Sequence, residues 1–297
     1  MTDYSSKLNQ DYYENDSHIG GKILRHKYGE YGFDNHKIWN ITRYISYWDY
    51  QLGLVAKYVN NQGGDILDLA CGDAPILEKI TNFNSYTGID ISSTRIAIDK
   101  KEYSNPKIKF QVDDILFPKS PLGRYDIILL NEIIEHVPDA AFLLNRVKGY
   151  LKPNGIIIIS TPLESRYLEG IGKVYEDNHL RVFSAKALKA LLIKEGFISE
   201  KVYISGFQLN ATITMQSSNP ILKIYKRLIG KKNIRMMDFE IKKIRIGLLD
   251  SKLLHTLYSK KILSKNSIQK IFFFFELLSN RFPIFGDQII LIARKKK

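Results

Sequence analysis

Carboxylate side chains follow two apolar stretches in the first half of the 297-residue sequence. Residues 65–74 read DILDLACGDA, in which an apolar run that contains Asp68 ends in a turn of small residues. Such a turn lets a ligand approach the backbone closely. A second apolar run, residues 86–91, carries Asp90, 22 residues after Asp68. In a doubly wound α/β sheet, an acid at this offset binds the ribose hydroxyls of a nucleoside. Two strand ends should therefore converge on one crevice.

The segment 132–136, which reads EIIEH, offers acid–base chemistry or a metal site. If it forms a helical turn after a strand, Glu132, Glu135 and His136 lie at i, i+3 and i+4 on one face. Such a face could hold a divalent cation, or the histidine could accept a proton from a reacting group. The residues leave both interpretations open.

These side chains need a sheet to position them, and the middle of the chain predicts one. Apolar runs indicate strands at 66–70, 86–91, 108–113, 125–130 and 155–160, with later strands at 199–205 and 287–293. Helical periodicity falls between them, at 74–82, 93–103, 140–151 and 184–195, and before them at 35–60. This alternation predicts an α/β fold, with a mostly parallel sheet, helices on both faces, and ligands at the carboxyl ends of the strands.

Composition excludes several classes of protein. With 44% hydrophobic residues the chain can bury a full core, so disorder is not expected. The single cysteine, Cys71, excludes an internal disulfide and a cysteine-rich metal cluster, and it agrees with a reducing compartment. The start of the sequence lacks a basic head followed by an apolar stretch, and no apolar run reaches the roughly 18 to 20 residues of a membrane-spanning helix. We therefore expect a cytoplasmic protein.

Positive charge is concentrated near the end of the sequence. Residues 220–297 hold 19 Lys and Arg against 5 Asp and Glu, whereas residues 1–219 hold 25 against 26. Helical stretches at 221–228, 239–249 and 268–278 mix these cations with Ile, Leu and Phe. The aromatic run 271–275 suits binding at a membrane interface, with a buried helix edge as the alternative. The asymmetry predicts an anionic partner, whether a lipid surface, a phosphorylated substrate or nucleic acid, or else a solvated face.

The motifs in their order resemble the class I S-adenosylmethionine-dependent methyltransferases, and among these the ubiquinone-pathway O-methyltransferase type. The series that carries the resemblance is DILDLACGDA, GIDIS, FQVDDILFP, RYDIILLNEIIEHVPD, LKPNGIIIISTP and HLRVFSAKALKALLIKEGF. The resemblance implies S-adenosylmethionine as cofactor and a seven-stranded, doubly wound sheet with an antiparallel last strand. It also implies three parts: a helical arm and cap (1–60), a core (61–210 with 286–297), and a basic helical insertion (211–285) that roofs the acceptor pocket.

The resemblance assigns cofactor-binding positions to the ends of the first four strands and to an Asn-x-x-Arg segment before them. These positions are Arg43, Asp68, Ala70, Gly72, Asp90, Ile91, Asp113, Asp114, Ile115 and Asn131. By resemblance Asp90 holds the ribose hydroxyls, and Arg43 pairs with the cofactor carboxylate. The sequence departs from the family's Gly-x-Gly-x-Gly turn at Ala70 and Ala74, where alanine is the mildest replacement.

Two catalytic interpretations follow from the resemblance. The transferred methyl group is already activated in this family, so the protein mainly aligns the acceptor and removes its proton. In the first interpretation His136 is the base, with Glu135 beside it and no metal. In the second, Glu132, Glu135 and His136 join a later histidine, His179, in a Mg²⁺ site similar to that of the quinone enzymes and the small-RNA 2′-O-methyltransferases.

The predicted function is O-methylation of a small-molecule, lipid-linked or glycan acceptor, with peripheral membrane contact through the basic region. RNA 2′-O-methylation is the alternative that the positive charge allows, although no recognised RNA-binding module accompanies it. A third hypothesis is a partner protein that binds S-adenosylmethionine without turnover.

Overall fold

The computed structural model describes residues 47–163, 180–205, 209–211, 244–246, 260–282 and 288–296. Arg43, His179 and the predicted helix 221–228 lie outside these residues. The predicted helix at 239–249 is wrong in its centre, because Ile244–Ile246 forms strand β8, which pairs antiparallel with β7, Leu209–Ala211.

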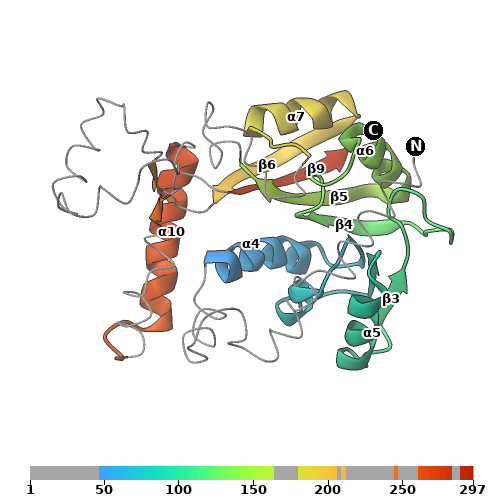
Figure 1. Ribbon diagram of the computed structural model, residues 1–297, viewed down its shortest axis with the longest axis horizontal. Coiled ribbons are helices and arrows are strands. Elements are labelled where there is room, and N and C mark those ends of the chain that lie inside the picture. The colour runs from blue at the N-terminus through green and yellow to red at the C-terminus, as the bar shows by residue number, and fades with distance from the viewer. Residues whose placement is uncertain are drawn as a thin grey trace, which may run out of the picture.

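Seven strands of the described chain form one sheet in the order β3-β2-β1-β4-β5-β9-β6 (Figure 1). Their bounds are β1 Asp65–Leu69, β2 Ser85–Asp90, β3 Ile108–Val112, β4 Tyr125–Asn131, β5 Leu151–Pro162, β6 Phe197–Ser205 and β9 Gln288–Lys295. The first five strands pair in parallel, whereas β9 is antiparallel to both β5 and β6. The predicted fold class is confirmed. The strand order reverses between β1 and β4, the point at which such sheets bind ligands.

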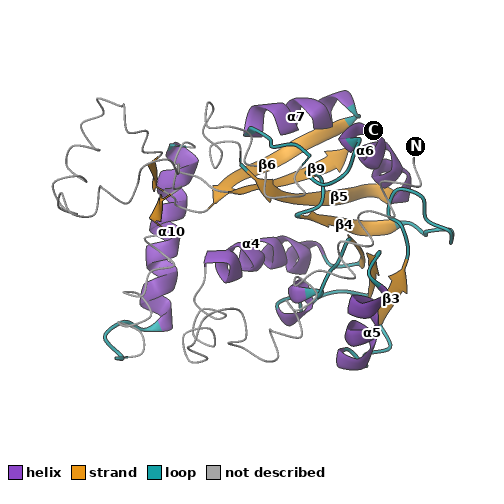
Figure 2. Cartoon of the chain, viewed as in Figure 1, coloured by secondary structure: helices purple, strands orange, loops and turns teal. Residues whose placement is uncertain are grey.

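Helices cover both faces of the sheet (Figure 2). They are α4 Tyr47–Gln62, α5 Ser93–Glu102, α6 Ala140–Tyr150 and α7 Ala185–Lys194. Alternate residues of each strand point to opposite faces. Ile127 and Leu129 of β4 therefore join a cluster with α4 and α5, whereas Ile128 and Leu130 join a second cluster with α6 and α7. Both clusters lie against the strands whose ends carry the predicted site.

The helix predicted at 74–82 is wrong, because only a short 3-10 helix, η2 Pro75–Glu78, forms there. The side chain of Asn60, at the end of α4, accepts hydrogen bonds from the backbone N–H groups of Thr81 and Asn82 at 2.7 and 3.1 Å. These contacts take up the N–H groups that a continuing helix would use, so the chain turns away after one turn.

A further helix, α10 Lys265–Arg281, stands beside α4 and the edge strand β6 (Figure 1). Ser264 caps it, since its side chain accepts from the backbone N–H of Ser267 at 3.1 Å. The sequence predicted a helix at 268–278, and this prediction is confirmed. None of the helices in the described ranges is both long and apolar enough to cross a bilayer.

Candidate active site

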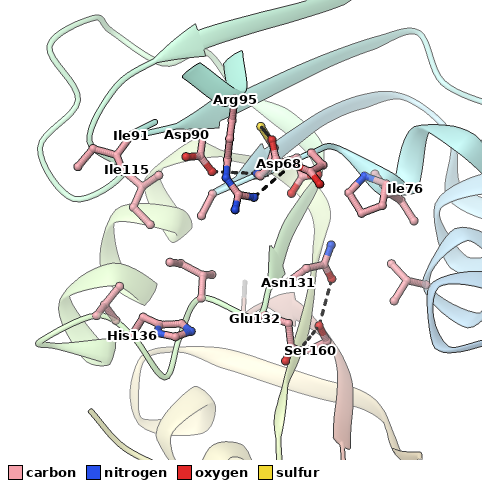
Figure 3. Close-up of a pocket in the computed structure, with 18 of the residues that line it drawn as sticks. Asp68, Ile76, Asp90, Ile91, Arg95, Ile115, Asn131, Glu132, His136 and Ser160 are labelled. Carbon is pink, nitrogen blue, oxygen red and sulfur yellow. Dashed lines mark hydrogen bonds and ion pairs between the residues drawn. The ribbon is translucent and has the colours of Figure 1, made fainter. Parts of the chain in front are cut away.

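A cavity of about 330 Å³ lies at the carboxyl ends of β1, β2, β4 and β5. Figure 3 shows Asp90, Arg95 and Ile115 on one side of it and Glu132, His136 and Ser160 on the other. Asn131 lies between the two groups. The cavity therefore has two ends, a carboxylate-bearing end at β1 and β2 and a mixed polar end at β4 and β5.

The turn after β1 uses left-handed backbone at three positions. Ala70, Gly72 and Ala74 have φ angles of 58°, 55° and 47°. Only glycine adopts this region without strain, and each alanine costs about 1 kcal/mol or somewhat more. The two alanines that depart from the glycine pattern thus lie at positions where glycine would be favoured. The turn keeps its conformation because the core on both sides determines it.

Asp90 at the end of β2 closes this turn. Its carboxylate accepts hydrogen bonds from the backbone N–H groups of Gly72 at 2.8 Å and Ser92 at 2.9 Å. Burial raises the pKa of Asp90, and the hydrogen bonds from Ser92 and Gly72 oppose that shift. The carboxylate lines the cavity with its position fixed by two backbone donors, and its predicted role in ribose binding stays a prediction.

Asp68 lies beneath the turn and is almost fully buried. The hydroxyl of Tyr86 donates a hydrogen bond to it at 2.7 Å. Burial raises the pKa of Asp68 to about 7, although the Tyr86 hydrogen bond opposes the shift, and the charge of Asp90 raises the pKa further. Asp68 therefore carries a proton for part of the time near neutral pH when no cation is beside it.

This buried acid should make the stability of the ligand-free protein depend on pH. Asp68 ionises near pH 3.8 in the unfolded chain but near 7 in the folded protein. Between these values the folded protein binds more protons, so its free energy of unfolding falls as the pH rises. We expect Asp68→Asn, which can keep the Tyr86 hydrogen bond, to be more stable than the parent by about 1 to 3 kcal/mol above neutral pH.

Thermal unfolding measured from about pH 5 to about pH 8 checks this prediction, because the parent should lose more stability across that range than the variant. The raised pKa of Asp90 also lowers stability as the pH rises, but it does so in both the parent and the variant, so it does not contribute to the difference between them. An equal loss in the two proteins would show that Asp68 is ionised throughout.

Asp113 and Asp114, which follow β3, have different roles. The carboxylate of Asp113 accepts from the backbone N–H groups of Asp114 at 2.9 Å and Lys119 at 3.0 Å, and from the side chain of Gln111 at 2.8 Å. Burial acts to raise the pKa of Asp113, but the hydrogen bonds from Lys119 and Gln111 outweigh it, so the pKa lies below its usual range. Asp113 thus both holds the loop and lines the cavity, while Asp114 and Ile115 line the cavity beside it.

The helical turn predicted for 132–136 is wrong at Glu132, although a turn closed by a hydrogen bond from the His136 N–H to the Ile133 carbonyl at 3.0 Å does follow it. The backbone of Glu132 is left-handed, with φ of 51°, which directs its side chain away from the face expected for a helix. The Glu132 carboxylate accepts from the hydroxyl of Ser160 at 2.8 Å and from the side-chain amide of Gln288. Glu132 is therefore held against the ends of β5 and β9.

Glu135 and His136 do come together. The side chain of Glu135 is 1% exposed and accepts from the hydroxyl of Thr161 at 2.9 Å. Its other oxygen lies 3.9 Å from Nε2 of His136, whose side chain is 14% exposed and lines the cavity. Among the residues that the structure describes, no three His, Cys, Asp or Glu side chains are grouped to hold a metal ion. The predicted fourth ligand, His179, lies outside those residues.

Several cavity residues were missing from the sequence prediction, among them Arg95, Ser160 and Gln288. Arg95 in the first turn of α5 contacts Asp73 at 3.2 Å, and Ser160 and Gln288 hold Glu132. Gln288 had a readable signal: the last strand was recognised, and the first residue of an antiparallel strand lies at the edge where its parallel neighbours end.

The methyltransferase domain family matches residues 44–200, more than half of the chain. The matched region contains the strands β1 and β4, between which the strand order reverses, and it includes Asp68 and Asp90. The chain belongs to the class I S-adenosylmethionine-dependent methyltransferases. The family match and the strand order confirm the resemblance drawn from the motifs.

Curated relatives of this methyltransferase are named "Ubiquinone biosynthesis O-methyltransferase". That of Rhodopseudomonas palustris (strain TIE-1) is 32% identical over 102 residues, which cover 34% of this chain and 40% of the relative. That of Coxiella burnetii (strain RSA 493 / Nine Mile phase I) is 31% identical over 112 residues, covering 35% and 48%. The chain thus spans less than half the length of these relatives. Among solved structures, N-methyltransferase NodS from Bradyrhizobium japonicum is 11% identical with a TM-score of 0.48, covering 84% of this chain and 97% of that one.

The cavity of this methyltransferase suits S-adenosylmethionine, whose sulfonium and ammonium groups are both cationic. Asp68 and Asp90 provide acidic groups at the turn, and apolar Ile91 and Ile115 provide a surface for a flat base. A nearby cation would favour the ionised form of Asp68. The family and this chemistry agree on the cofactor, which Asp68, Gly72, Asp90 and Asn131 would hold.

Proposed function

We propose that this protein transfers the methyl group of S-adenosylmethionine to a hydroxyl oxygen of a small-molecule or lipid-linked acceptor. One observation carries the proposal: His136, backed by the buried Glu135, lies across the cavity from Asp90. This arrangement supports a role for His136 as proton acceptor, with Asp90 as the acid that would bind the ribose of the cofactor. The curated relatives, whose names state O-methylation in ubiquinone biosynthesis, support the same class of acceptor.

In this proposal, the cavity residues have different roles in the reaction. Bound S-adenosylmethionine supplies a methyl group already activated on sulfur. His136 accepts the proton of the acceptor hydroxyl as the oxygen becomes the nucleophile. The carboxylate of Glu135, behind the imidazole, stabilises the positive charge that His136 gains. Glu132 and Gln288, at the end of the cavity near His136, offer hydrogen-bonding groups that can orient a polar acceptor.

An acceptor screen tests this proposal. The protein is incubated with S-adenosylmethionine labelled in its methyl group and with cell extracts separated into lipid, glycan, small-molecule and RNA pools. We expect label in the lipid or small-molecule pool, in a linkage with the stability of an aryl or alkyl ether. Label in RNA would replace the proposal by RNA 2′-O-methylation. Tight cofactor binding with no labelled product in any pool would favour a partner protein without turnover.

The same assay separates the two catalytic interpretations of His136. Glu132 is bound to Ser160 and Gln288, and Glu135 is buried against Thr161, so neither carboxylate is arranged with His136 as a three-ligand face. We therefore expect turnover to persist in excess chelator, within about twofold of the untreated rate, because proton transfer to His136 needs no metal. Loss of turnover that Mg²⁺ restores would contradict this expectation and assign Glu135 and His136 to a metal site.

A further inference from the structure

Helix α10 exposes several apolar side chains and buries two polar ones, although Ile268 near its start is fully buried. Phe273, Phe274 and Leu277 are 54%, 55% and 53% exposed, whereas Glu276 and Ser279 are buried. A surface helix of a globular domain normally shows the reverse arrangement. More than half of each of these three apolar side chains is thus in contact with solvent.

Polar contacts fix this orientation. The hydroxyl of Tyr50 in α4 donates a hydrogen bond to Glu276. The side chain of Asn280 accepts from the backbone N–H of Ile204 at 3.0 Å and donates to its carbonyl at 3.1 Å. Asn280 thus pairs with the edge strand β6 as a neighbouring strand would. Turning α10 to bury its phenyl rings would break all three hydrogen bonds.

Cations flank the apolar face. Lys260, Lys261, Lys270 and Arg281 are exposed along residues 260–282, where the buried Glu276 is the only acid. Ile262 before the helix and Phe282 after it are also exposed. Together these residues form what we call the α10 face: exposed Phe, Leu and Ile side chains bordered by Lys and Arg.

We propose that the α10 face binds the surface of a bilayer that contains anionic lipids. Aromatic and aliphatic side chains enter the boundary between head groups and acyl chains, and each cation near the lipid phosphates adds attraction. A second copy of this face would bring like charges together, which disfavours self-association. Nucleic acid would leave the aliphatic Leu277 and Ile262 without a base to stack on, so the combination favours lipid.

Helix α10 lies close to a helix that lines the cavity. Figure 1 shows α10 standing at one side of the molecule, next to the end of α4. In α4, Tyr50 holds Glu276 of α10 while the next residue, Gln51, lines the cavity. A protein docked through the α10 face would therefore keep its cavity close to the bilayer. Docking itself does not depend on methyl transfer.

Vesicle flotation with the full chain tests the proposal. Vesicles of phosphatidylcholine alone are compared with vesicles of equal parts phosphatidylcholine and phosphatidylglycerol. We expect the protein to float with the anionic vesicles, to float at least about tenfold less with phosphatidylcholine alone, and to be released as salt rises. Phe273→Ser combined with Leu277→Ser should reduce partitioning at least about tenfold, because both side chains leave water on binding.

A matched control removes the same apolar groups elsewhere. Ile193 and Ile198 are about as exposed, on α7 and β6, so Ile193→Ser with Ile198→Ser should float like the parent. Lys270→Gln with Arg281→Gln leaves the apolar side chains in place and should reduce flotation and its salt dependence. Thermal unfolding and cofactor affinity should remain at parent values in every variant.

Three outcomes would overturn the proposal. The first is absence of flotation with anionic vesicles, and the second is equal flotation of the Phe273/Leu277 variant and the parent. The third is that the parent binds RNA or forms dimers but does not bind vesicles, and that the Phe273/Leu277 variant loses this binding. The α10 face would then bind RNA or a second copy of the chain. None of these outcomes bears on methyl transfer, which the acceptor screen tests separately.

Discussion

Asp90→Ala should weaken the binding of S-adenosylmethionine by about 30- to 100-fold, the largest loss of affinity that we expect from a single substitution. Hydrogen bonds to a charged group contribute about 1.5 to 3 kcal/mol each, and every 1.4 kcal/mol is tenfold in affinity. The carboxylate lies at the carboxyl end of β2 with its position fixed by Gly72 and Ser92. Removing it takes away the predicted ribose acceptor together with the hydrogen bonds that hold the backbone at Gly72 and Ser92.

Isothermal titration calorimetry measures this loss without an acceptor. Asp90→Asn keeps an oxygen for one backbone donor and should lose less affinity than alanine. The matched control is Asp65→Ala, at the other end of β1, which loses a 2.7 Å hydrogen bond to Ser85 and an ion pair with Lys152. We expect Asp65→Ala to lower stability and leave the cofactor affinity unchanged. An unaltered affinity in Asp90→Ala would place the cofactor elsewhere.

The sequence predicted the sheet and the carboxylate end of the cavity for a physical reason. Buried parallel strands are short apolar runs, and their carboxyl ends share one edge, so Asp68 and Asp90 could be placed together from spacing alone. The signal is periodic and local. The helices α5, α6 and α7 followed in the same way, because each begins at a capping side chain and repeats its apolar positions every three or four residues.

The other end of the cavity depends on the backbone conformation of Glu132 and on a contact between distant segments, which the sequence pattern did not predict even though it located the last strand. Glu132 adopts a left-handed conformation that glycine or asparagine would have signalled, so the regular spacing of Glu132, Glu135 and His136 was misleading. Its partner Gln288 is 156 residues away in the sequence. The same holds for α10: its composition predicted the helix, but only the contacts with Tyr50 and Ile204 show which side faces outward.

His136→Ala should lower kcat by about 10²- to 10⁴-fold, since general-base catalysis contributes that range. The imidazole lies in the cavity, and the cofactor-binding acids lie at the opposite end (Figure 3). The affinity for S-adenosylmethionine should therefore stay within about threefold of the parent value, because the acids predicted to bind the cofactor lie at the other end of the cavity. Turnover is measured with the acceptor that the screen identifies, and affinity by calorimetry.

Glu135→Gln tests whether His136 acts as a base or only packs in the cavity. The amide side chain of this variant would still accept the Thr161 hydrogen bond, so the fold should persist, but no carboxylate would stabilise the protonated imidazole. We expect kcat to fall about tenfold, which corresponds to the loss of about 1.4 kcal/mol of charge stabilisation. The pH profile of the parent rate should change in His136→Ala, because that variant lacks the proton acceptor. If His136→Ala retained the full rate and the pH profile of the parent, the acceptor would lose its proton without His136.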